Sequence, residues 1–343
     1  MLSSLSSQDG APQTQEDPKP ARSEAFWFHS GDVVLHVENT RFRVHCEMLS
    51  RHSNIFKDTF SMPQFTTVPG HSDEAFVDGC PVVPLFDKAS DVGHMLSVFY
   101  DNFQTHDWRE QMDIDHLSAL LRLGKKYEID YFTKEALRRL RSECPATLNA
   151  WDDRDVYGKE GDIVFPLEVD DVTTKIINLA HEVSLPSVLP AAYLRYVQDG
   201  TMRSIAEETR ICSQDRIHCI LGRASVLDFI CHKLARWHER EVFTPGEDCS
   251  SRKACGVLRR KTVDPDSFLL WGGFDGEYGP IRTLGVDTLS EFCSGCRRSI
   301  YSSYNRNRAE LWEKLPTFFG LPEWEELKGQ DFDKYSYFFE STM

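Results

Sequence analysis

The stretch Gly31-Asp-Val-Val-Leu-His-Val37, followed by Arg41-Phe-Arg-Val-His45, decides the fold of this chain. The first segment is a short β-branched run, and the second alternates between polar and apolar residues. Both patterns are typical of β-strands. Residues 38–40 supply a polar turn between them, so the sequence predicts a β-hairpin. From Cys46 onward the apolar spacing becomes helical.

Helices and one more strand are predicted to follow this hairpin. A polar break at residues 51–54 divides the first helical region into two short helices. Residues 63–79 hold two prolines and two glycines and predict a surface loop. Residues 82–86 predict a third strand, which Pro84 would place at a sheet edge because proline donates no ladder hydrogen bond. Further helices are expected up to Leu140. The predicted apolar core of the two short helices is Met48, Leu49, Ile55, Phe56 and Phe60.

The second half of the chain has mostly helical periodicity. Its longest amphipathic run covers residues 215–237, and a further helix is expected at 308–315. Residues 244–296 are rich in glycine and cysteine and show little helical period. The sequence therefore predicts a disordered tail at 1–25, an α+β domain at 26–143, a linker at 144–166 and a mainly α-helical domain with a cysteine-bearing loop region at 167–343.

Composition narrows the function classes. The chain of 343 residues carries 39 Lys and Arg against 54 Asp and Glu, a net charge of −15. Such a chain repels phosphate backbones unless it segregates its basic residues, so nucleic acid is an unlikely partner on this ground. The N-terminus lacks a signal-peptide pattern, and no apolar run is long enough for a membrane span. Ten scattered cysteines favour reduced thiols, hence the cytoplasm or the nucleus.

The first domain resembles a BTB/POZ domain over residues 26–143. The resemblance is carried by Gly31-Asp-Val-Val34, by Ser53-Asn-Ile-Phe-Lys-Asp-Thr-Phe60 and by Leu96-Ser-Val-Phe-Tyr100. The segment Pro81-Val-Val-Pro-Leu-Phe-Asp87 and the tail from Trp312 to Trp324 are similar to the fungal branch of the family. The resemblance implies a protein-interaction module, often self-associating as a homodimer, which in some relatives docks the ubiquitin-ligase scaffold cullin-3.

Two positions depart from the family pattern. Cys46 follows His45 where many relatives have Lys or Arg, so a charged groove built with Asp32 would be incomplete. Gln64 stands where cullin-binding relatives often have Glu. Homodimerisation and cullin-3 binding therefore both stay open. Asp32 and His45 are predicted to be polar anchors at the strand ends.

Four cysteines form the only pattern typical of a metal site. Cys293-Ser-Gly-Cys296 is a C-x2-C knuckle, while Cys249 and Cys255 have the less usual spacing C-x5-C. Four thiolates make a closed tetrahedral zinc site, whose sulfur atoms would lie roughly 3.5–4 Å apart. The alternative is that these residues are small buried hydrophobes. The sequence thus indicates a structural zinc as a cofactor, and it indicates no catalytic residues.

A basic run at residues 252–261, five Arg or Lys in ten residues, is the other conspicuous feature. It fits either a solvated loop or a nuclear signal or nucleic-acid patch. The function that we predict is non-catalytic protein–protein interaction, as an adaptor or scaffold. The alternatives are a substrate adaptor of a cullin-3 type ubiquitin ligase and a transcriptional regulator that uses this basic patch.

Overall fold

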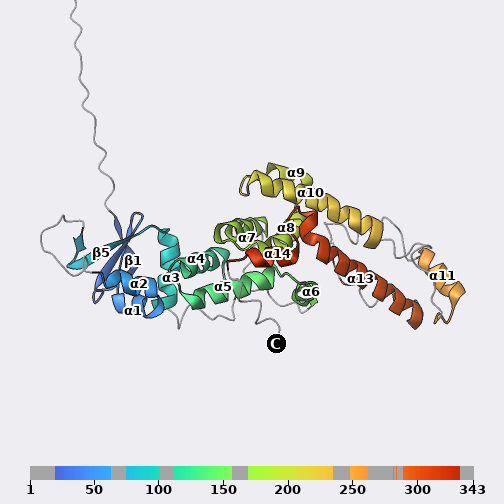
Figure 1. Cartoon of the computed structure of the whole chain (residues 1–343), viewed down its shortest axis with the longest axis horizontal. Helices are drawn as coiled ribbons and strands as arrows, with labels where there is room; N and C mark the ends of the chain where they lie inside the picture. Colours follow the sequence, from blue (N-terminus) through green and yellow to red (C-terminus); the bar gives the residue numbers. More distant parts are fainter. Residues whose placement is uncertain are drawn as a thin grey trace, which may run out of the picture. The chain divides into compact units, whose positions relative to one another are not determined.

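The computed structural model of the chain describes residues 20–62, 75–100, 111–156, 169–234, 248–261, 281, 283 and 289–332. Contacts divide the chain into two compact units. The first comprises residues 1–105 and 125–129, and the second comprises residues 106–124 and 130–343. Figure 1 shows a sheet with short helices in the first unit and an assembly of helices in the second.

The first unit is built on a mixed five-stranded sheet in the order β1-β3-β2-β5-β4. The antiparallel pair β2–β3 is the predicted hairpin, and its turn is reduced to Glu38 and Asn39, since Val37 pairs with Thr40. Glu38 adopts the positive φ of 50° that such a tight turn requires. The strands are β1 (Ala21–Trp27), β2 (Val33–Val37), β3 (Thr40–Val44), β4 (Phe76–Val77) and β5 (Cys80–Leu85).

Two expectations about the sheet need correction. β1 begins at Ala21, inside the range predicted to be a disordered tail, and it pairs in parallel with β3. β5 is not an edge strand, because β4 lies outside it. β4 pairs only with Cys80 and Pro81, however, so Pro84 pairs on one side with His36 of β2. The very short β4 explains why proline is tolerated there.

The two short helices follow the sequence prediction closely. Ser53 ends α1 (Cys46–His52) and caps α2 (Asn54–Phe60), because its hydroxyl accepts a hydrogen bond from the Phe56 backbone N–H at 3.1 Å. The same hydroxyl donates to the Tyr127 carbonyl at 2.6 Å. The buried core of the first unit comprises Val33, Val34, Leu35, Leu49, Phe56, Val92, Met95 and Leu96.

The second unit is helical. Helix α8 packs against α7, α10 and α13, and α10 packs against α13. Ion pairs connect α7 to α4 and α8 to α5. The bounds are α4 (Ile114–Lys126), α5 (Asp130–Glu143), α6 (Leu148–Val156), α7 (Val169–Val183), η2 (Pro186–Val188), α8 (Leu189–Asp199), α9 (Met202–Glu207), α10 (Ser213–Phe229), η3 (Ile230–Leu234), α11 (Arg252–Lys261), α13 (Ser294–Phe318) and α14 (Trp324–Gln330); α3 (Ala89–Tyr100) belongs to the first unit. No described helix is long and apolar enough to cross a membrane.

Three segments of the second unit are more helical than the sequence predicts. α6 lies in the range read as an irregular linker, and α11 lies in the cysteine-bearing stretch that shows little helical period. α13 has 25 residues and starts fourteen residues earlier than the predicted helix at 308–315. Its first half is rich in Ser, Asn and Arg, so its apolar stripe is weak and local pattern alone gives little signal.

Ion pairs join the second-unit part of α4 and α5 to the helices that follow. Arg122 of α4 contacts Glu182 of α7 at 2.8 Å, and Glu143 of α5 accepts from Arg195 of α8 at 2.8 Å. Arg141 of α5 contacts Asp331, whose carboxylate also accepts from the Ser187 hydroxyl at 2.6 Å. α5 is therefore integrated with the C-terminal helices by buried and half-buried polar contacts.

Candidate functional site

Polar anchors connect the strand ends of the first unit to α1 and α3. Asp32 accepts the Cys46 backbone N–H at 2.7 Å and so holds the start of α1. The two ring nitrogens of His45 lie 3.1 Å from the Tyr100 hydroxyl and 3.0 Å from the Ser30 hydroxyl. Both residues singled out in the sequence are thus anchors, and Tyr100 is a partner that the sequence did not reveal.

The Cys46 thiol is unreactive in this environment. Burial, the negative charge of Asp32 and the hydrogen bond with Asp32 together raise the pKa of the Cys46 thiol to about 12. A thiol with so high a pKa is a poor nucleophile at neutral pH. The residue that takes the place of the family's basic group therefore supplies neither positive charge nor reactivity.

An apolar stripe lies on α2 and the residues just after it. Ile55 on α2 is 37% exposed, and Met62, two residues beyond the end of α2, is 46% exposed. These two side chains make up the apolar stripe. Ile55 was expected in the core, and that expectation is wrong. Phe56 takes the core position instead, with its ring 4.3 Å from that of Tyr127. Residue 64 lies outside the described residues.

Comparison with known families gives a clear result for the first part of the chain. The family model of the BTB/POZ domain matches residues 26–143. This range contains a BTB/POZ domain. The match confirms the resemblance found in the sequence, while the more specific likeness to a fungal branch has no support. A search of curated proteins finds no match for the chain.

The BTB/POZ domain sets the general class of function. Such domains are generally protein–protein interaction modules and are typically non-catalytic. The match extends through α5, whose described ion pairs run to the helices of the second unit. The BTB/POZ domain therefore shares its last helix with the C-terminal helical part.

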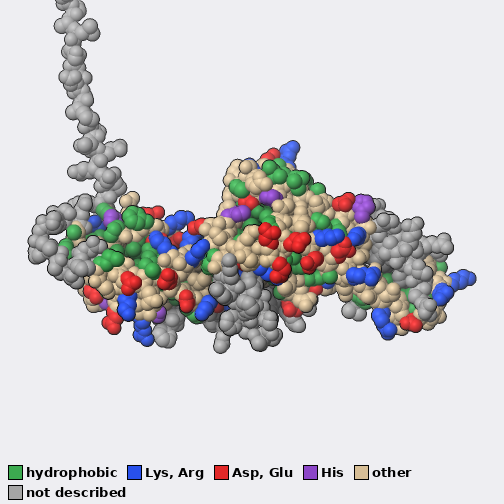
Figure 2. Space-filling model, viewed as in Figure 1, with side chains coloured by type: hydrophobic (Ala, Val, Ile, Leu, Met, Phe, Trp, Pro, Cys, Tyr) green, Lys and Arg blue, Asp and Glu red, His purple; other side chains and the backbone are tan. Residues whose placement is uncertain are grey.

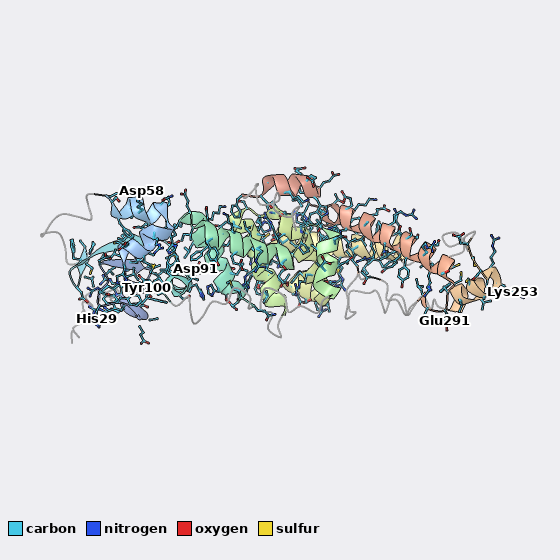
Figure 3. All side chains as sticks on the ribbon, turned by 90° about the horizontal axis from the view of Figure 1, so that it is seen from below. His29, Asp58, Asp91, Tyr100, Lys253 and Glu291 are labelled. Atoms are coloured by element: carbon cyan, nitrogen blue, oxygen red, sulfur yellow. The ribbon has the colours of Figure 1, made fainter. Side chains whose placement is uncertain are left out.

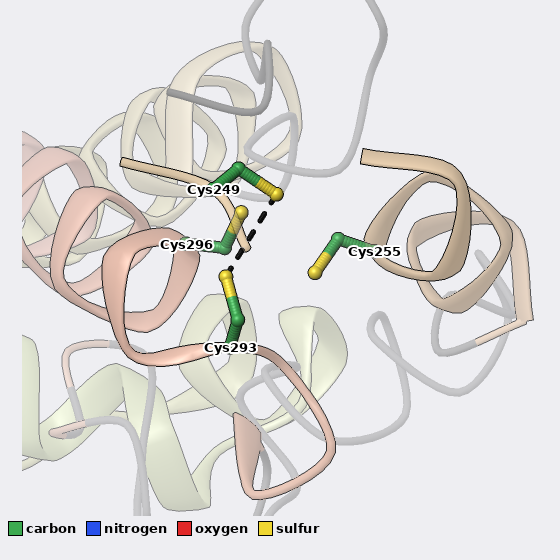
Figure 4. A group of neighbouring side chains, drawn as sticks. All are labelled: Cys249, Cys255, Cys293 and Cys296. Carbon is green, nitrogen blue, oxygen red and sulfur yellow. Dashed lines mark hydrogen bonds between the residues drawn. The ribbon is translucent and has the colours of Figure 1, made fainter. Parts of the chain in front are cut away.

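The four cysteines singled out in the sequence come together in the second unit. Figure 4 shows Cys249 before α11, Cys255 within α11, and Cys293 and Cys296 at the start of α13. All four sulfur atoms lie within 4.8 Å of one another, and the sulfurs of Cys249 and Cys293 are 3.8 Å apart. One pair thus has the spacing expected of a tetrahedral zinc site, and the set is slightly wider. Four clustered cysteines can form such a site.

The backbone around the four cysteines favours their arrangement as ligands of a metal ion. The backbone amides of Cys296 and Ser250 lower the pKa of Cys293 to about 6, whereas burial raises the pKa values of Cys255 and Cys296. A Cβ atom added to Gly295 would meet the Asp248 carbonyl oxygen at 2.6 Å. Glycine between the two knuckle cysteines therefore permits the segment with Cys249 to approach α13 closely.

A carboxylate at the start of α10 joins three helices, and sequence reasoning missed it. Asp215 is 2% exposed and accepts from the Tyr193 hydroxyl at 2.5 Å, from His181 at 2.9 Å and from the Cys212 thiol at 3.2 Å. A nucleophilic triad needs the imidazole between thiol and carboxylate. Here the carboxylate is central, and no contact between His181 and Cys212 occurs among the described residues. The cluster is therefore structural.

Asp215 belongs to the buried stripe of α10. Asp215, Cys219, Gly222 and Val226 are all buried and are spaced four, three and four residues apart. An acid in the buried stripe of an amphipathic helix requires partners. Apolar periodicity does not reveal this stripe in the sequence, because Ile217 and Leu221 on the same helix are 49% and 59% exposed.

The contact between His181 and Asp215 predicts a pH-dependent contribution to stability. The hydrogen bond with Asp215 raises the pKa of His181 against the opposing effect of burial. Burial alone would raise the pKa of Asp215, but hydrogen bonds from His181, Tyr193 and Cys212 outweigh it and lower that pKa. The stabilisation from His181 is therefore complete below the unfolded histidine pKa of about 6.5 and is lost as pH rises through the folded value.

We expect His181→Gln to lower the urea midpoint more at pH 6 than at pH 8.5, relative to the native chain. His232→Gln is the control, because its ion pair with Asp228 has side chains 67% and 73% exposed and contributes little. An equal loss for His181→Gln at both pH values would show that the charged form of His181 does not stabilise the fold.

Proposed function

We propose that the protein is a non-catalytic adaptor or scaffold, acting in the cytoplasm or the nucleus, whose BTB/POZ domain binds another protein. The observation that carries this proposal is the family match over residues 26–143. The apolar stripe of Ile55 and Met62 gives the domain a surface on which a partner can bury apolar area. Figure 2 shows hydrophobic side chains gathered on the visible face of the first unit.

Two narrower forms of this proposal follow from the family resemblance. One is self-association as a homodimer, and the other is docking to cullin-3 as the substrate adaptor of a ubiquitin ligase. The exposed stripe at Ile55 and Met62 supplies an apolar contact for either partner. Sedimentation of the purified chain and binding to purified cullin-3 distinguish them.

Met62→Asp tests the surface. Met202 on α9 offers a matched control, because both methionine side chains are 46% exposed and only Met62 belongs to the BTB/POZ domain. An aspartate in the centre of an apolar contact costs about 2 kcal/mol or more, which lowers affinity more than tenfold. Affinity purification of the full chain should retain a stoichiometric partner with the native chain and Met202→Asp, and should lose it with Met62→Asp.

The full chain is the right bait for this test. β1 starts at Ala21, and α5 shares ion pairs with the C-terminal helices, so a fragment of residues 26–143 would cut the sheet and expose charged groups. Retention of the same partner by Met62→Asp would place the interaction elsewhere. Absence of any partner and a purely monomeric chain would contradict the adaptor proposal.

We further propose that the four-cysteine cluster holds a structural zinc ion. α11 supports this proposal, since Cys255 is the only buried side chain among its described ones, from 252 to 258. A helix of ten residues is marginal by itself in water and must be held by tertiary contacts. Zinc bound to Cys255 and to the two cysteines of α13 supplies such a contact. Elemental analysis of the purified, reduced chain tests the proposal and should find about one zinc per chain.

A further inference from the structure

Positive charge is concentrated around the cysteine cluster. Residues 249–261 and 292–308 contain nine of the 39 Lys and Arg residues and no Asp or Glu, so the other 30 stand against all 54 acids. The net charge of −15 is therefore the sum of a strongly basic region and a strongly acidic remainder. This is the segregation that a generally acidic chain needs before it can approach a polyanion.

The cysteine cluster joins the two basic segments. Arg252 lies three residues before Cys255 on α11, and Arg297 and Arg298 directly follow Cys296 on α13. Lys253 and Glu291 are seen at the same end of the second unit in Figure 3. In Figure 2 the visible charged side chains over α11 and the start of α13 are mainly basic. One compact region thus carries both sets of cations.

These cations form no ion pair in the described part of the chain, although Glu291 and Lys253 line one pocket. Arg252, Lys253, Arg298 and Arg306 are exposed, Arg297 is half-buried, and none of the five forms an ion pair or side-chain hydrogen bond with a described residue. Elsewhere in the second unit cations are commonly paired, as Lys233 is with Glu310 at 2.5 Å and Arg195 with Glu143 at 2.8 Å. The unpaired cations are therefore free to meet an external anion.

Compensation of the metal charge does not account for this set. A zinc ion with four thiolates carries about two negative charges, which two nearby cations balance. Five described Arg and Lys residues lie on the two helices that carry Cys255 and Cys296. Arg259, Arg260 and Lys261 continue the run in the sequence. At least three positive charges are left over for a ligand.

The uncharged residues between the cations identify the class of anion. The exposed positions in the first half of α13 that are not Arg are Ser294, Ser299, Ser302 and Asn305. Arg, Lys, Ser and Asn side chains are the groups that contact phosphate and sugar in nucleic-acid complexes. An acidic protein partner would favour apolar residues among the cations. α13 has none exposed between Ser294 and Arg306, and α11 exposes only Ala254 and Val257 among its described positions.

We propose that α11 and the start of α13, held together by the four cysteines, bind the phosphate backbone of a nucleic acid. This inference rests on the proposed zinc site for the arrangement of the two helices. The contacts carry no base readout, so binding depends on charge and salt and little on sequence. Duplex DNA and single-stranded RNA share the required chemistry.

Fluorescence anisotropy with the zinc-loaded full chain tests the proposal. The probes are a labelled DNA duplex and a single-stranded RNA, each of about 20 nucleotides per strand, measured between about 50 and 200 mM salt. With three phosphate contacts the affinity for the duplex should fall roughly 40-fold over this range. The variant Arg252→Gln, Lys253→Gln, Arg298→Gln, Arg306→Gln should bind at least about tenfold more weakly at low salt, with a log–log salt slope reduced by about three.

A charge-matched control removes the effect of net charge. It replaces four cations elsewhere in the second unit by Gln, namely Lys134, Arg203, Lys314 and Lys328, and it should bind like the native chain. No binding to either probe at low salt, equal weakening by both variants, or equally strong competition by polyglutamate would overturn the proposal.

Zinc content measured on the same samples separates the two proposals. Nucleic-acid binding by a metal-free chain would contradict the proposed zinc site and would support the proposed nucleic-acid surface. A zinc-containing chain that fails to bind would overturn only the present inference. A preference for the DNA probe or for the RNA probe then shows which type of nucleic acid the protein binds.

Discussion

Cys296→Ser should release the zinc and detach α11 from α13. Serine offers no thiolate, and Cys296 is fully buried at the first turn of α13, so the ligand cannot be replaced by a neighbour without a rearrangement. Zinc binding contributes about 10–16 kcal/mol in small zinc-finger peptides, and the α11 region resembles them in having few buried side chains. We expect zinc content near zero by elemental analysis and much faster tryptic cleavage within residues 252–261.

Cys231→Ser is the matched control for this prediction. Cys231 lies in the same unit, is exposed, and is not a member of the four-cysteine cluster. Its replacement should leave both the zinc content and the cleavage rate unchanged. A Cys296→Ser chain that keeps a full complement of zinc would show that the cluster is not the metal site, whereas native chain without zinc would show that the thiols are simply packed.

The strands and helices of the BTB/POZ domain were predictable where local pattern and tertiary environment agree. β2 is buried on both faces and is rich in valine, and Ser53 is both a polar break and a cap. β1 was missed because Ala21-Arg-Ser-Glu24 has little strand propensity; its pairing with β3 supplies the stabilisation. Ile55 was misplaced because a helical period does not distinguish the core face from an interaction face.

The candidate metal site could be predicted from spacing, but its context could not. The C-x2-C knuckle of Cys293 and Cys296 is a local pattern, so the sequence contains it directly. The approach of Cys249 and Cys255 depends on the fold, including the close contact between Gly295 and Asp248. Net charge has a similar limit, because −15 is a sum over the chain and the position of the basic residues depends on the fold.

Gly222→Ala should be strongly destabilising, because α10 and α13 meet at this glycine. A Cβ atom at position 222 would overlap the ring of Phe319, which is fully buried and also packs 5.5 Å from the ring of Tyr193. The ring therefore has no free space to move into, and the two helices must separate. Overpacking of this kind costs about 3 kcal/mol, so urea unfolding should show a clearly lowered midpoint.

Gly329→Ala gives the opposite result for the same chemical change. Gly329 lies in α14 with nothing within 4 Å of an added Cβ, so alanine should stabilise the chain by about 0.5–1 kcal/mol. Phe319→Leu combined with Gly222→Ala should recover part of the loss, because the smaller side chain vacates the space that the new methyl group needs. If Gly222→Ala were as stable as Gly329→Ala, α10 and α13 could not pack through this contact, and the arrangement of the second unit described above would be wrong.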